Sequence, residues 1–366
     1  MRIGIVTQPL EMNYGGILQN WALQQVLKRL GHDPITIDAY QRFTTLHYLY
    51  SCLRFWWYDS RGKEGWTFPK RYHGTLRRKE TGRFVEQHIA TTRVMWDYDP
   101  KVVKRYGLEA LLVGSDQVWR PQYNKRIEDK FLKFAEGLPL RRVAYAASFG
   151  VDEWTYTPEQ AAECSRLLRQ FDAVSVREDS AVALCREHLG VSARRVLDPT
   201  LLLDAQDYQE IIDKEWDAGE QYLAVYCLDI TPAKREFFNR IADRRGLRVR
   251  FFTAGVQAEL TIGQWLAMFS NASLVVTDSF HGTVFSILFD KEFYSLANPG
   301  RGNARMKGVL AMLGLESRLL CDKEPNEADS KAIDWTTTHE RLNSERKESL
   351  EFLFSSLCPP KEMKSQ

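Results

Sequence analysis

The stretch "VVTDSFHGTVFSILF", from Val275 to Phe289, places a cluster of polar and small residues inside an otherwise apolar run. Burying an unpaired polar group costs about 1–3 kcal/mol, so Thr277-Asp278-Ser279 and His281-Gly282 need a physical reason. The pattern predicts a buried strand, a polar turn and a buried helix. At such a turn the backbone N–H groups are free, and a helix N-terminus favours an anion. The stretch therefore predicts an α/β unit whose turn faces a ligand.

The same strand, loop and helix pattern continues along the chain and predicts two Rossmann-like domains that face a central cleft. Apolar strands alternate with amphipathic helices, which predicts parallel sheets with right-handed crossovers. The pattern restarts near Asp204, with a hinge expected between Asp198 and Asp207. We therefore expect an N-terminal domain over residues 1–204, a C-terminal domain over 205–340, and a final helix and tail over 341–366. The strand sequences of the two domains are RIGIVT, PITID, ALLVG, RRVAYAASFG and DAVSV, then QYLAVYCL, LRVRFFTA, ASLVVTD and EFYSLA.

Composition and charge limit the class of protein. The chain has 366 residues, 44% hydrophobic and 27% charged, with a net charge of +2, which is typical of a globular protein and not of a polyanion binder. The start, MRIGIVTQPLEMNYGG, does not resemble a signal peptide, and no apolar run is long enough to span a membrane. Six cysteines lie far apart, which predicts reduced thiols and no disulfide framework or zinc site. These features predict a cytoplasmic protein.

Residues 41–95 differ in composition from the rest of the chain. They hold 11 Lys and Arg and 4 Asp and Glu, a balance of 11 − 4 = +7, whereas the remainder carries (50 − 11) − (48 − 4) = −5. They also hold 11 of the 44 aromatic residues, including Trp56-Trp57-Tyr58. We treat this segment as a basic, aromatic insert in the N-terminal domain.

Polar turns follow several of the predicted strands, and ligands of open parallel sheets bind beyond the carboxyl ends of the strands. Because these turns converge on one sheet edge, we predict functional roles for His281 and Arg177. Motifs for a zinc protease, a phosphate loop or a nucleophile elbow do not occur, and no metal is expected. We expect ligand-binding residues at Asn13, Gly15, Gly16, Ser115, Gln117, Ser148 and Ser279, beside Asp116 and Asp278.

Taken together, the turn motifs resemble those of the polysaccharide pyruvyl transferases. The resemblance implies a two-domain fold similar to GT-B glycosyltransferases. It also implies transfer of pyruvate from phosphoenolpyruvate onto two hydroxyls of a sugar, giving a ketal in a surface, capsular or other exopolysaccharide. The motifs occur in order over about the first four fifths of the chain; they are NYGGILQNWALQ (13–24), VGSDQVWRP (113–121), YAASFG (145–150), SVRED (175–179), LDPTLLL (197–203) and VTDSFHGTVFS (276–286).

The resemblance also implies roles for individual residues. Arg177 corresponds to an arginine that grips phosphoenolpyruvate, and His281 corresponds to the catalytic histidine. Some family members have Arg-Leu-His where this chain has Ser279-Phe280-His281, so one arginine is missing. The segment NPGRGNARMKG offers replacements for its charge, with Arg301, Arg305 and Lys307 as alternatives and Asn303 beside them.

The chemistry of phosphoenolpyruvate fits these residue types. Its carboxylate and phosphate need guanidinium groups and helix N-termini. Its C3 must gain a proton, for which an imidazole that titrates near neutrality is suited. Asp116 or Asp278 either orients His281 or accepts a hydroxyl proton. The donor is then a substrate, and no cofactor is expected.

Two other functions are compatible with the same sequence. One is a GT-B-like glycosyltransferase that uses a nucleotide sugar, because fold does not fix function. The other is a non-catalytic scaffold of a polysaccharide assembly complex.

The insert allows several interpretations as well. It forms either a helical subdomain with a small aromatic core, an acceptor-binding element or a contact with the inner face of the membrane. We favour the membrane contact, because family acceptors can be lipid-linked and anionic. Nucleic acid is not expected as a partner.

Overall fold

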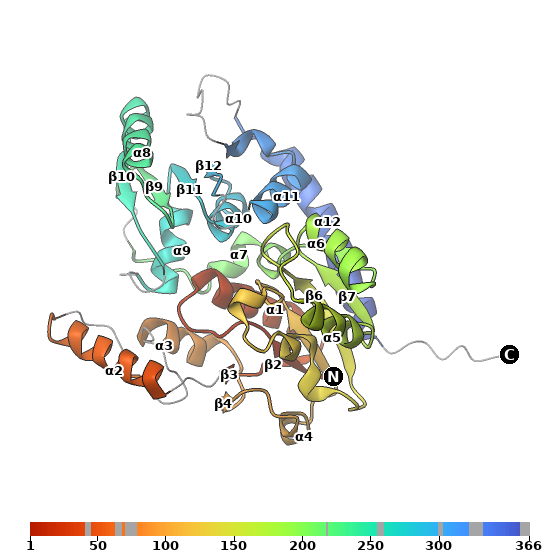
Figure 1. Ribbon diagram of the computed structural model, residues 1–366. Coiled ribbons are helices and arrows are strands. Elements are labelled where there is room, and N and C mark those ends of the chain that lie inside the picture. Colours follow the sequence, from red (N-terminus) through yellow and green to blue (C-terminus); the bar gives the residue numbers. More distant parts are fainter. Residues whose placement is uncertain are drawn as a thin grey trace.

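Two parallel β-sheets form the body of the protein (Figure 1). The structure is a computed structural model that describes residues 1–40, 45–62, 68–69, 79–216, 219–254, 260–298, 303–321 and 332–358. The first sheet has the strand order β2-β1-β5-β6-β7-β8 and the second has the order β10-β9-β11-β12-β13. Every neighbouring pair in both sheets is parallel, which confirms the predicted parallel α/β architecture.

The strands are short and mostly buried on both faces, as expected for parallel sheets covered by helices. Every residue of β5 and β9 is buried. The first sheet consists of β1 (Arg2–Val6), β2 (Asp33–Thr36), β5 (Ala110–Gly114), β6 (Arg141–Ala147), β7 (Ala173–Val176) and β8 (Arg194–Arg195). The second consists of β9 (Tyr222–Tyr226), β10 (Arg248–Phe251), β11 (Leu274–Thr277), β12 (Glu292–Leu296) and β13 (Leu319–Leu320).

Helices begin where the sequence supplies caps. Thr157 with Gln160 and Thr261 with Gln264 form capping boxes at the starts of two helices, in which side chains satisfy the free N–H groups of the first turn. The α-helices of the body are α1 (Tyr14–Arg29), α4 (Lys101–Tyr106), α5 (Pro158–Leu168), α6 (Asp179–Leu184), α7 (Ala205–Tyr208), α8 (Pro232–Arg245), α9 (Ile262–Ser270), α10 (Phe280–Leu288), α11 (Ala304–Leu313) and α12 (Trp335–Leu357). Short helical turns are η1 (Pro121–Tyr123), η2 (Ile127–Phe131), η3 (Lys133–Ala135), η4 (Cys185–Leu189), η5 (Pro199–Leu202) and η8 (Glu316–Arg318).

Strand order reverses at one point in each sheet, and these points decide where a ligand can bind. In the first sheet the reversal lies between β1 and β5, and in the second between β9 and β11. Connections leave the two strands at such a point toward opposite faces, which opens a crevice beyond their carboxyl ends. The loops after β1 and β5 and the loops after β9 and β11 therefore form the expected binding edge of each sheet.

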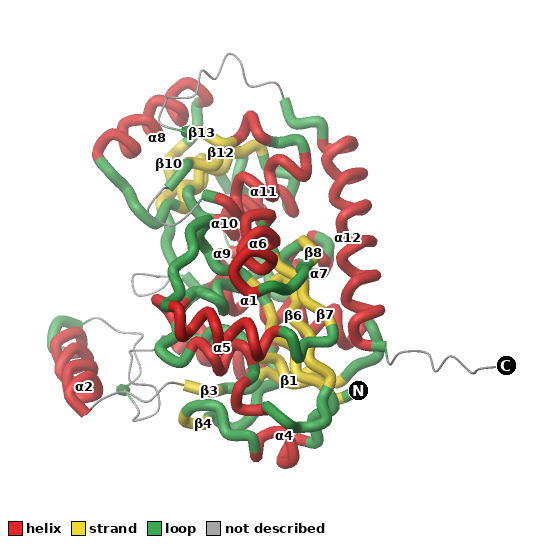
Figure 2. Tube along the Cα trace, turned by 45° about the vertical axis from the view of Figure 1, so that its right-hand side comes forward, coloured by secondary structure: helices red, strands yellow, loops and turns green. Residues whose placement is uncertain are grey.

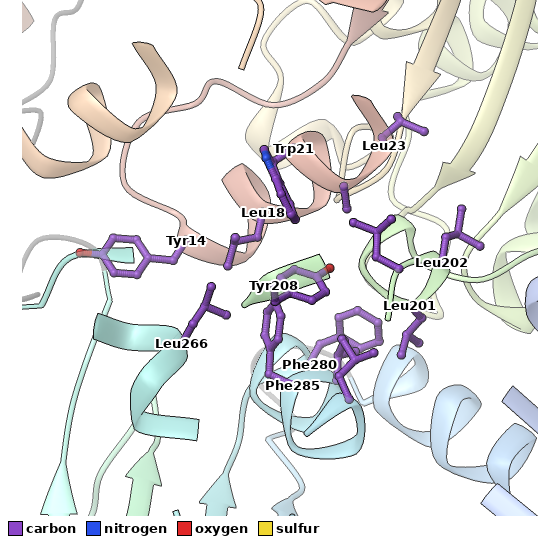
Figure 3. Close-up of a cluster of buried hydrophobic side chains, with 14 of the residues drawn as sticks. Tyr14, Leu18, Trp21, Leu23, Leu201, Leu202, Tyr208, Leu266, Phe280 and Phe285 are labelled. Carbon is purple, nitrogen blue, oxygen red and sulfur yellow. The ribbon is translucent and has the colours of Figure 1, made fainter. Parts of the chain in front are cut away.

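A continuous apolar core joins the two sheets. Tyr14 and Trp21 of α1 pack against Trp265 and Tyr208, with ring centroids 6.0 and 5.4 Å apart. Figure 3 shows Leu18 and Trp21 of α1 facing Tyr208 and Phe285 across this boundary. The segment from Asp198 to Asp207, where we expected a hinge, contributes η5 and α7 to the core; Leu201 and Leu203 are buried within it.

The last helix returns from the second sheet to the first (Figure 2). Helix α12 begins at Trp335, before the expected start at residue 341, because the Asp334 side chain accepts a hydrogen bond from Thr337 N at 3.2 Å. Arg346 of α12 donates to the carbonyls of Leu201 and Leu203 at 2.6 and 2.7 Å. Residues 359–366 of the expected tail lie outside the described part of the chain.

The insert leaves the first sheet between two very short strands, β3 (Ala39–Tyr40) and β4 (Met95–Trp96), which pair in parallel. Its described elements are α2 (Thr45–Asp59) and α3 (Lys79–His88). Helix α3 contributes Phe84 and Val85 to the core, whereas α2 stands away from the body in both views (Figures 1 and 2). The described part of the insert is therefore helical, as one of the interpretations expected.

Candidate functional site

A cavity of about 280 Å³ lies between the two sheets, at the carboxyl ends of their strands. Loops after β1 and β5 supply one wall. The ends of β9 and β11, the loop after β10 and the first turn of α11 supply the other. Both reversal points therefore face the same space. The lining residues are Met12, Asn13, Gly15, Asp116, Gln117, Tyr123, Tyr226, Leu228, Ala254, Asp278, Ser279, Phe280, His281, Arg305 and Met306.

The N-termini of α1, α10 and α11 meet at this cavity. Residues of the first turn or cap of each helix line it: Asn13 and Gly15 of α1, Ser279 and His281 of α10, and Arg305 of α11. The first turns of these helices consist of uncharged or basic residues. Aligned peptide dipoles leave a partial positive charge at a helix N-terminus. The three helix ends, together with Arg305, therefore favour an anion at their part of the wall, which also carries the carboxylates of Asp116 and Asp278.

His281 lies at the start of α10 and is almost completely buried, with 7% of its surface exposed. Its Nε2 atom has no hydrogen-bond partner among the described residues. Burial lowers the pKa of His281 to about 4, with Asp198 raising it and Arg177 lowering it. The imidazole is therefore neutral at pH 7 in the ligand-free protein. This corrects the expectation of a group that titrates near neutrality, because the sequence does not show how deeply the ring is buried.

Gly15 is the residue of α1 against which the His281 ring packs. A Cβ atom at position 15 would lie 2.0 Å from His281 Nδ1, a distance that real atoms do not reach. The first glycine of the Asn-Tyr-Gly-Gly sequence is thus required by close approach of the two helix ends. Through Gly15, helix α1 of the N-terminal domain is in direct contact with the His281 ring of the C-terminal domain.

Arg177 lies behind the cavity wall and is not one of the residues that line the cavity. Its Nη1 atom donates to Asp198 Oδ2 at 2.6 Å, and both side chains are 1% exposed or less. Burial by itself lowers the pKa of Arg177, but Asp198, Glu178 and Asp116 together raise it above its ordinary value. Its Nε and Nη2 atoms have no hydrogen-bond partner among the residues that the structure describes. Arg177 is thus a fixed, charged group one layer from the ligand space.

Two arginines lie near the ring of Phe280. The Arg177 guanidinium lies 4.7 Å from the centre of the Phe280 ring, and that of Arg305 lies 5.8 Å from it. Arg305 itself lines the cavity. Burial, and then the charge of Arg177, lower the pKa of Arg305 to about 10, so it remains charged at pH 7.

Among the three basic alternatives of the NPGRGNARMKG segment, the structure brings Arg305 to the cavity. Lys307 is exposed and does not line it, and Arg301 lies outside the described residues. Asn303 precedes α11 and accepts a hydrogen bond from Asn298 N at 2.7 Å, so it shapes the loop and does not face the cavity.

The first-domain wall is held by Asp116 and Asn13. Asp116 has a positive φ of 66°, in the left-handed region that aspartate tolerates better than most residues. Its Oδ2 atom accepts a hydrogen bond from Asn13 Nδ2 at 3.2 Å, while Asn13 Oδ1 caps α1 by accepting from Gly16 N. Gln117 lines the cavity beside them. The structure therefore brings these predicted residues together.

Asp278 also lines the cavity, but its oxygens hold the second-domain loops. Oδ1 accepts from Leu228 N at 2.6 Å, and Oδ2 accepts from Lys234 Nζ at 3.0 Å and from Asn298 Nδ2 at 3.2 Å. This pattern fits a residue that positions the loops after β9 and β12. Of the two aspartates that we considered beside His281, Asp116 is the one whose charge acts on the pKa of the ring.

Two of the predicted serines support the wall from behind. Ser115 donates to Asp198 Oδ2 at 3.0 Å, and Ser148 donates to Glu178 Oε1 at 2.8 Å; both serines are fully buried. Ser279 does line the cavity, and its backbone N–H donates to Thr277 Oγ1 at 3.1 Å.

Sequence reasoning missed two carboxylates that organise the site. Asp198 accepts four hydrogen bonds, from Arg177, Ser115 and both the backbone and hydroxyl of Thr200. Burial raises its pKa, but Arg177 and Thr200 outweigh this and hold it at about 2. Glu178 accepts from Phe149 N at 3.0 Å as well as from Ser148. Asp198 lies in the LDPT motif and Glu178 lies in the SVRED motif. Their positions within these motifs could have identified them as site residues.

The second domain adds wall residues that carried no sequence signal. Tyr226, Leu228, Ala254 and Met306 line the cavity from strand ends and helix starts whose proximity only folding creates. Within the described part of the chain, no group of three or more His, Cys, Asp or Glu side chains is placed to hold a metal ion.

Two parallel sheets that face one cavity at their reversal points define a protein of the GT-B class. Solved structures with a similar fold support this assignment of the fold class. A UDP-GlcNAc 2-epimerase from Methanocaldococcus jannaschii is similar with a TM-score of 0.53 and 10% identity, covering 94% of this chain and 92% of that one. A candidate UDP-N-acetylglucosamine 2-epimerase from Listeria monocytogenes gives 0.52 and 10%, covering 96% and 90%. At this identity the likeness concerns the fold alone.

Sequence comparison identifies the family within this class. The family described as polysaccharide pyruvyl transferase matches residues 13–300. The chain belongs to the polysaccharide pyruvyl transferase family, which confirms the resemblance drawn from the motifs. No curated protein matches the chain.

The contact between Gly15 and His281 leads to a first prediction. Gly15→Ala should displace the imidazole, because overpacking of this kind costs about 1–3 kcal/mol. We expect a lower melting temperature and a changed NMR chemical shift for the His281 ring. Gly308→Ala is the matched control, since a Cβ atom there meets nothing within 4 Å. An unchanged His281 signal in Gly15→Ala would contradict the close packing.

Proposed function

We propose that this protein transfers pyruvate from phosphoenolpyruvate onto two hydroxyls of a sugar, forming a ketal during biosynthesis of a surface or capsular polysaccharide. The observation that carries the proposal is the meeting of three helix N-termini with Arg305 and a buried imidazole in one cavity. Phosphoenolpyruvate is a small anion with a carboxylate and a phosphate. Family membership supports the same reaction.

Arg305 and the helix N-termini are the groups that we assign to anion binding. A guanidinium can donate two parallel hydrogen bonds to a carboxylate or a phosphate. Arg305 offers this charge at the cavity wall, in place of the arginine that Ser279 replaces. Arg177 stays paired with Asp198 near Phe280 and adds positive potential, so its role in this proposal is to position Phe280 and Asp198.

His281 is the group that we assign to proton transfer. A trianionic ligand beside it favours the charged form and therefore raises its pKa, so binding of the donor is coupled to protonation of the ring. The imidazolium then gives its proton to C3 of phosphoenolpyruvate, and C2 becomes electrophilic. One sugar hydroxyl attacks C2 and its proton returns to the imidazole. The second hydroxyl attacks the same carbon as the C2–O bond to phosphate breaks, and its proton leaves with the phosphate.

The first test is release of phosphate. We expect phosphoenolpyruvate to raise the melting temperature of the purified protein by mass action. An acceptor saccharide should then stimulate phosphate release, and His281→Ala should lower turnover by about 10²–10⁴-fold. Stabilisation by uridine or guanosine nucleotides without any effect of phosphoenolpyruvate would instead favour a nucleotide-sugar glycosyltransferase. Absence of turnover with either donor would favour the scaffold.

A second test separates the basic residues of α11. Arg305→Gln should weaken phosphoenolpyruvate binding by at least tenfold, because hydrogen bonds to charged groups each contribute about 1.5–3 kcal/mol. Lys307→Gln, which removes a charge two positions away on the same helix but outside the cavity, should bind like the wild type. Isothermal titration of both variants measures this difference. Equal affinities would show that Arg305 does not contact the anion.

We also propose that the insert brings the enzyme to a membrane surface that carries lipid-linked acceptor. Helix α2 presents six large apolar side chains at 47–79% exposure, and Leu46, Tyr50, Leu53 and Trp57 recur with helical spacing along one side. Arg54 and Arg61 lie against the Tyr58 and Trp57 rings. Apolar and aromatic side chains with basic flanks suit the interface of an anionic bilayer. Of the helices within the described ranges, none is long and apolar enough to cross a membrane.

Vesicle sedimentation tests this docking. The protein should sediment with anionic vesicles at low salt and be released at high salt, since each basic residue near an anionic leaflet contributes about 1 kcal/mol that salt screens. Leu53→Glu should abolish sedimentation, whereas Phe354→Glu, at a similarly exposed aromatic of α12, should not. Charge reversal at Lys79, and at Arg77 and Arg78, which lie outside the described residues, should weaken sedimentation. Equal sedimentation with neutral and anionic vesicles, or none, would exclude the electrostatic docking.

A further inference from the structure

A second cavity, of about 200 Å³, lies beside the first on the N-terminal side of the molecule. The two cavities share one wall residue, Tyr123. A hydrogen bond of 2.8 Å from Gln8 Nε2 to Gln117 O also joins their linings. The second cavity is lined by Gln8, Pro9, Glu11, Ala39, Tyr40, Asp97, Tyr98, Tyr123, Asn124, Lys125, Arg126, Asp129 and Lys130.

The second cavity lies beside the two points where the chain enters and leaves the insert. Ala39 and Tyr40 form β3, at the point where the chain enters the insert, and Asp97 and Tyr98 follow β4, where the chain leaves it. The cavity therefore lies at the base of the insert. Its lining thus includes one residue of the first cavity and the residues that flank the insert.

The second cavity has equal numbers of acidic and basic side chains in its lining. Three acidic and three basic side chains line it, and several pair with one another: Arg126 lies 3.4 Å from Asp97 Oδ2 and 3.0 Å from Asp129 Oδ2. The first cavity is also lined by Asp116 and Asp278, but Arg305 and three helix N-termini meet there, and Lys234 pairs with Asp278. The second therefore suits a neutral ligand that both accepts and donates hydrogen bonds.

The floor of the second cavity is rigid. Lys130 is 4% exposed and donates from Nζ to Thr7 O at 2.5 Å and to the Tyr98 hydroxyl at 2.8 Å. Burial lowers the pKa of Lys130 to about 7 and raises that of Tyr98 well above its usual range, so the Tyr98 hydroxyl keeps its proton. The floor is thus built before any ligand arrives.

Aromatic surface completes the second cavity. Tyr123 is 53% exposed, and the Arg120 guanidinium lies 4.6 Å from its ring centre. Tyr40 and Tyr98 contribute two further rings. An amphipathic ring offers apolar contact area at low entropic cost, beside polar groups that fix orientation. Rings, carboxylates and amides around a neutral space are complementary to the C–H face and hydroxyls of a pyranose.

We propose that this second cavity is the acceptor subsite and holds a neutral pyranose residue, with Tyr123 lining both the donor space and the acceptor space. The inference rests on the proposed pyruvyl transfer, since a ketal requires two hydroxyls of one sugar to reach C2 of the donor. An acceptor must therefore abut the anion cavity, and this space does so through a shared side chain. Its place at the base of the insert lets the remainder of the acceptor continue toward the surface that α2 contacts.

Saturation-transfer NMR with methyl pyranosides of glucose, galactose, mannose and their N-acetyl derivatives tests the subsite. At least one pyranoside should receive saturation from the wild-type protein. Tyr123→Ala should weaken its binding by at least tenfold, whereas Tyr123→Phe, which keeps the ring, should bind within about threefold of the wild type. Phe354→Ala, at an aromatic residue of similar exposure on α12, is the matched control and should bind normally.

Two results would overturn the inference: no saturation of any pyranoside, or equal binding by Tyr123→Ala and the wild type. Arg305→Gln separates this inference from the proposed function, because it should lose phosphoenolpyruvate binding and keep pyranoside binding. Pyranoside binding that depends on Tyr123, without any stabilisation by phosphoenolpyruvate, would refute pyruvyl transfer and leave a sugar site. Phosphoenolpyruvate binding without a Tyr123-dependent pyranoside site would refute the acceptor subsite and leave the proposed pyruvyl transfer standing.

Discussion

The buried pair of Arg177 and Asp198 is the interaction on which the arrangement of the site depends. The two side chains lie 2.6 Å apart with almost no exposed surface. Removing one partner of such a pair costs about 3–5 kcal/mol, because a buried charge is left uncompensated. Asp198 also receives Ser115 from the end of β5 and Thr200 from η5. One carboxylate therefore fixes the ends of two strands and the start of the segment that leads into the second domain.

Near this pair, the two domains contact each other at the ends of their helices. Phe280 lies over Arg177 at 4.7 Å, and the adjacent His281 ring packs on Gly15. The apolar core between α1 and α10 continues the same boundary (Figure 3). Packing on one side and a charge pair on the other therefore hold the helix ends that line the first cavity. Binding of an anion there would require little reorganisation of the wall.

The two cavities differ in the physical basis on which each would recognise a ligand: charge in the first cavity and shape in the second. Helix N-termini and Arg305 surround one of them, whereas paired charges and tyrosine rings surround the other. His281 lies at the anion cavity as a neutral ring, since burial lowers its pKa. Its protonation state therefore depends on what occupies the cavity. In the proposed reaction, such coupling would keep His281 uncharged until phosphoenolpyruvate is bound.

The sequence by itself determined the α/β class, the parallel sheets, the restart of the pattern near residue 204 and the family, because alternating apolar strands and capped helices are local features. It also placed Asn13, Asp116 and His281 at strand ends that meet. Only the tertiary structure decided that Arg305 lines the cavity, that Arg177 lies near Phe280 and does not line it, and that Asp198 organises the wall. Burial and the pairing of charges arise from contacts between residues far apart in the chain, and the local pattern carries no record of those distances.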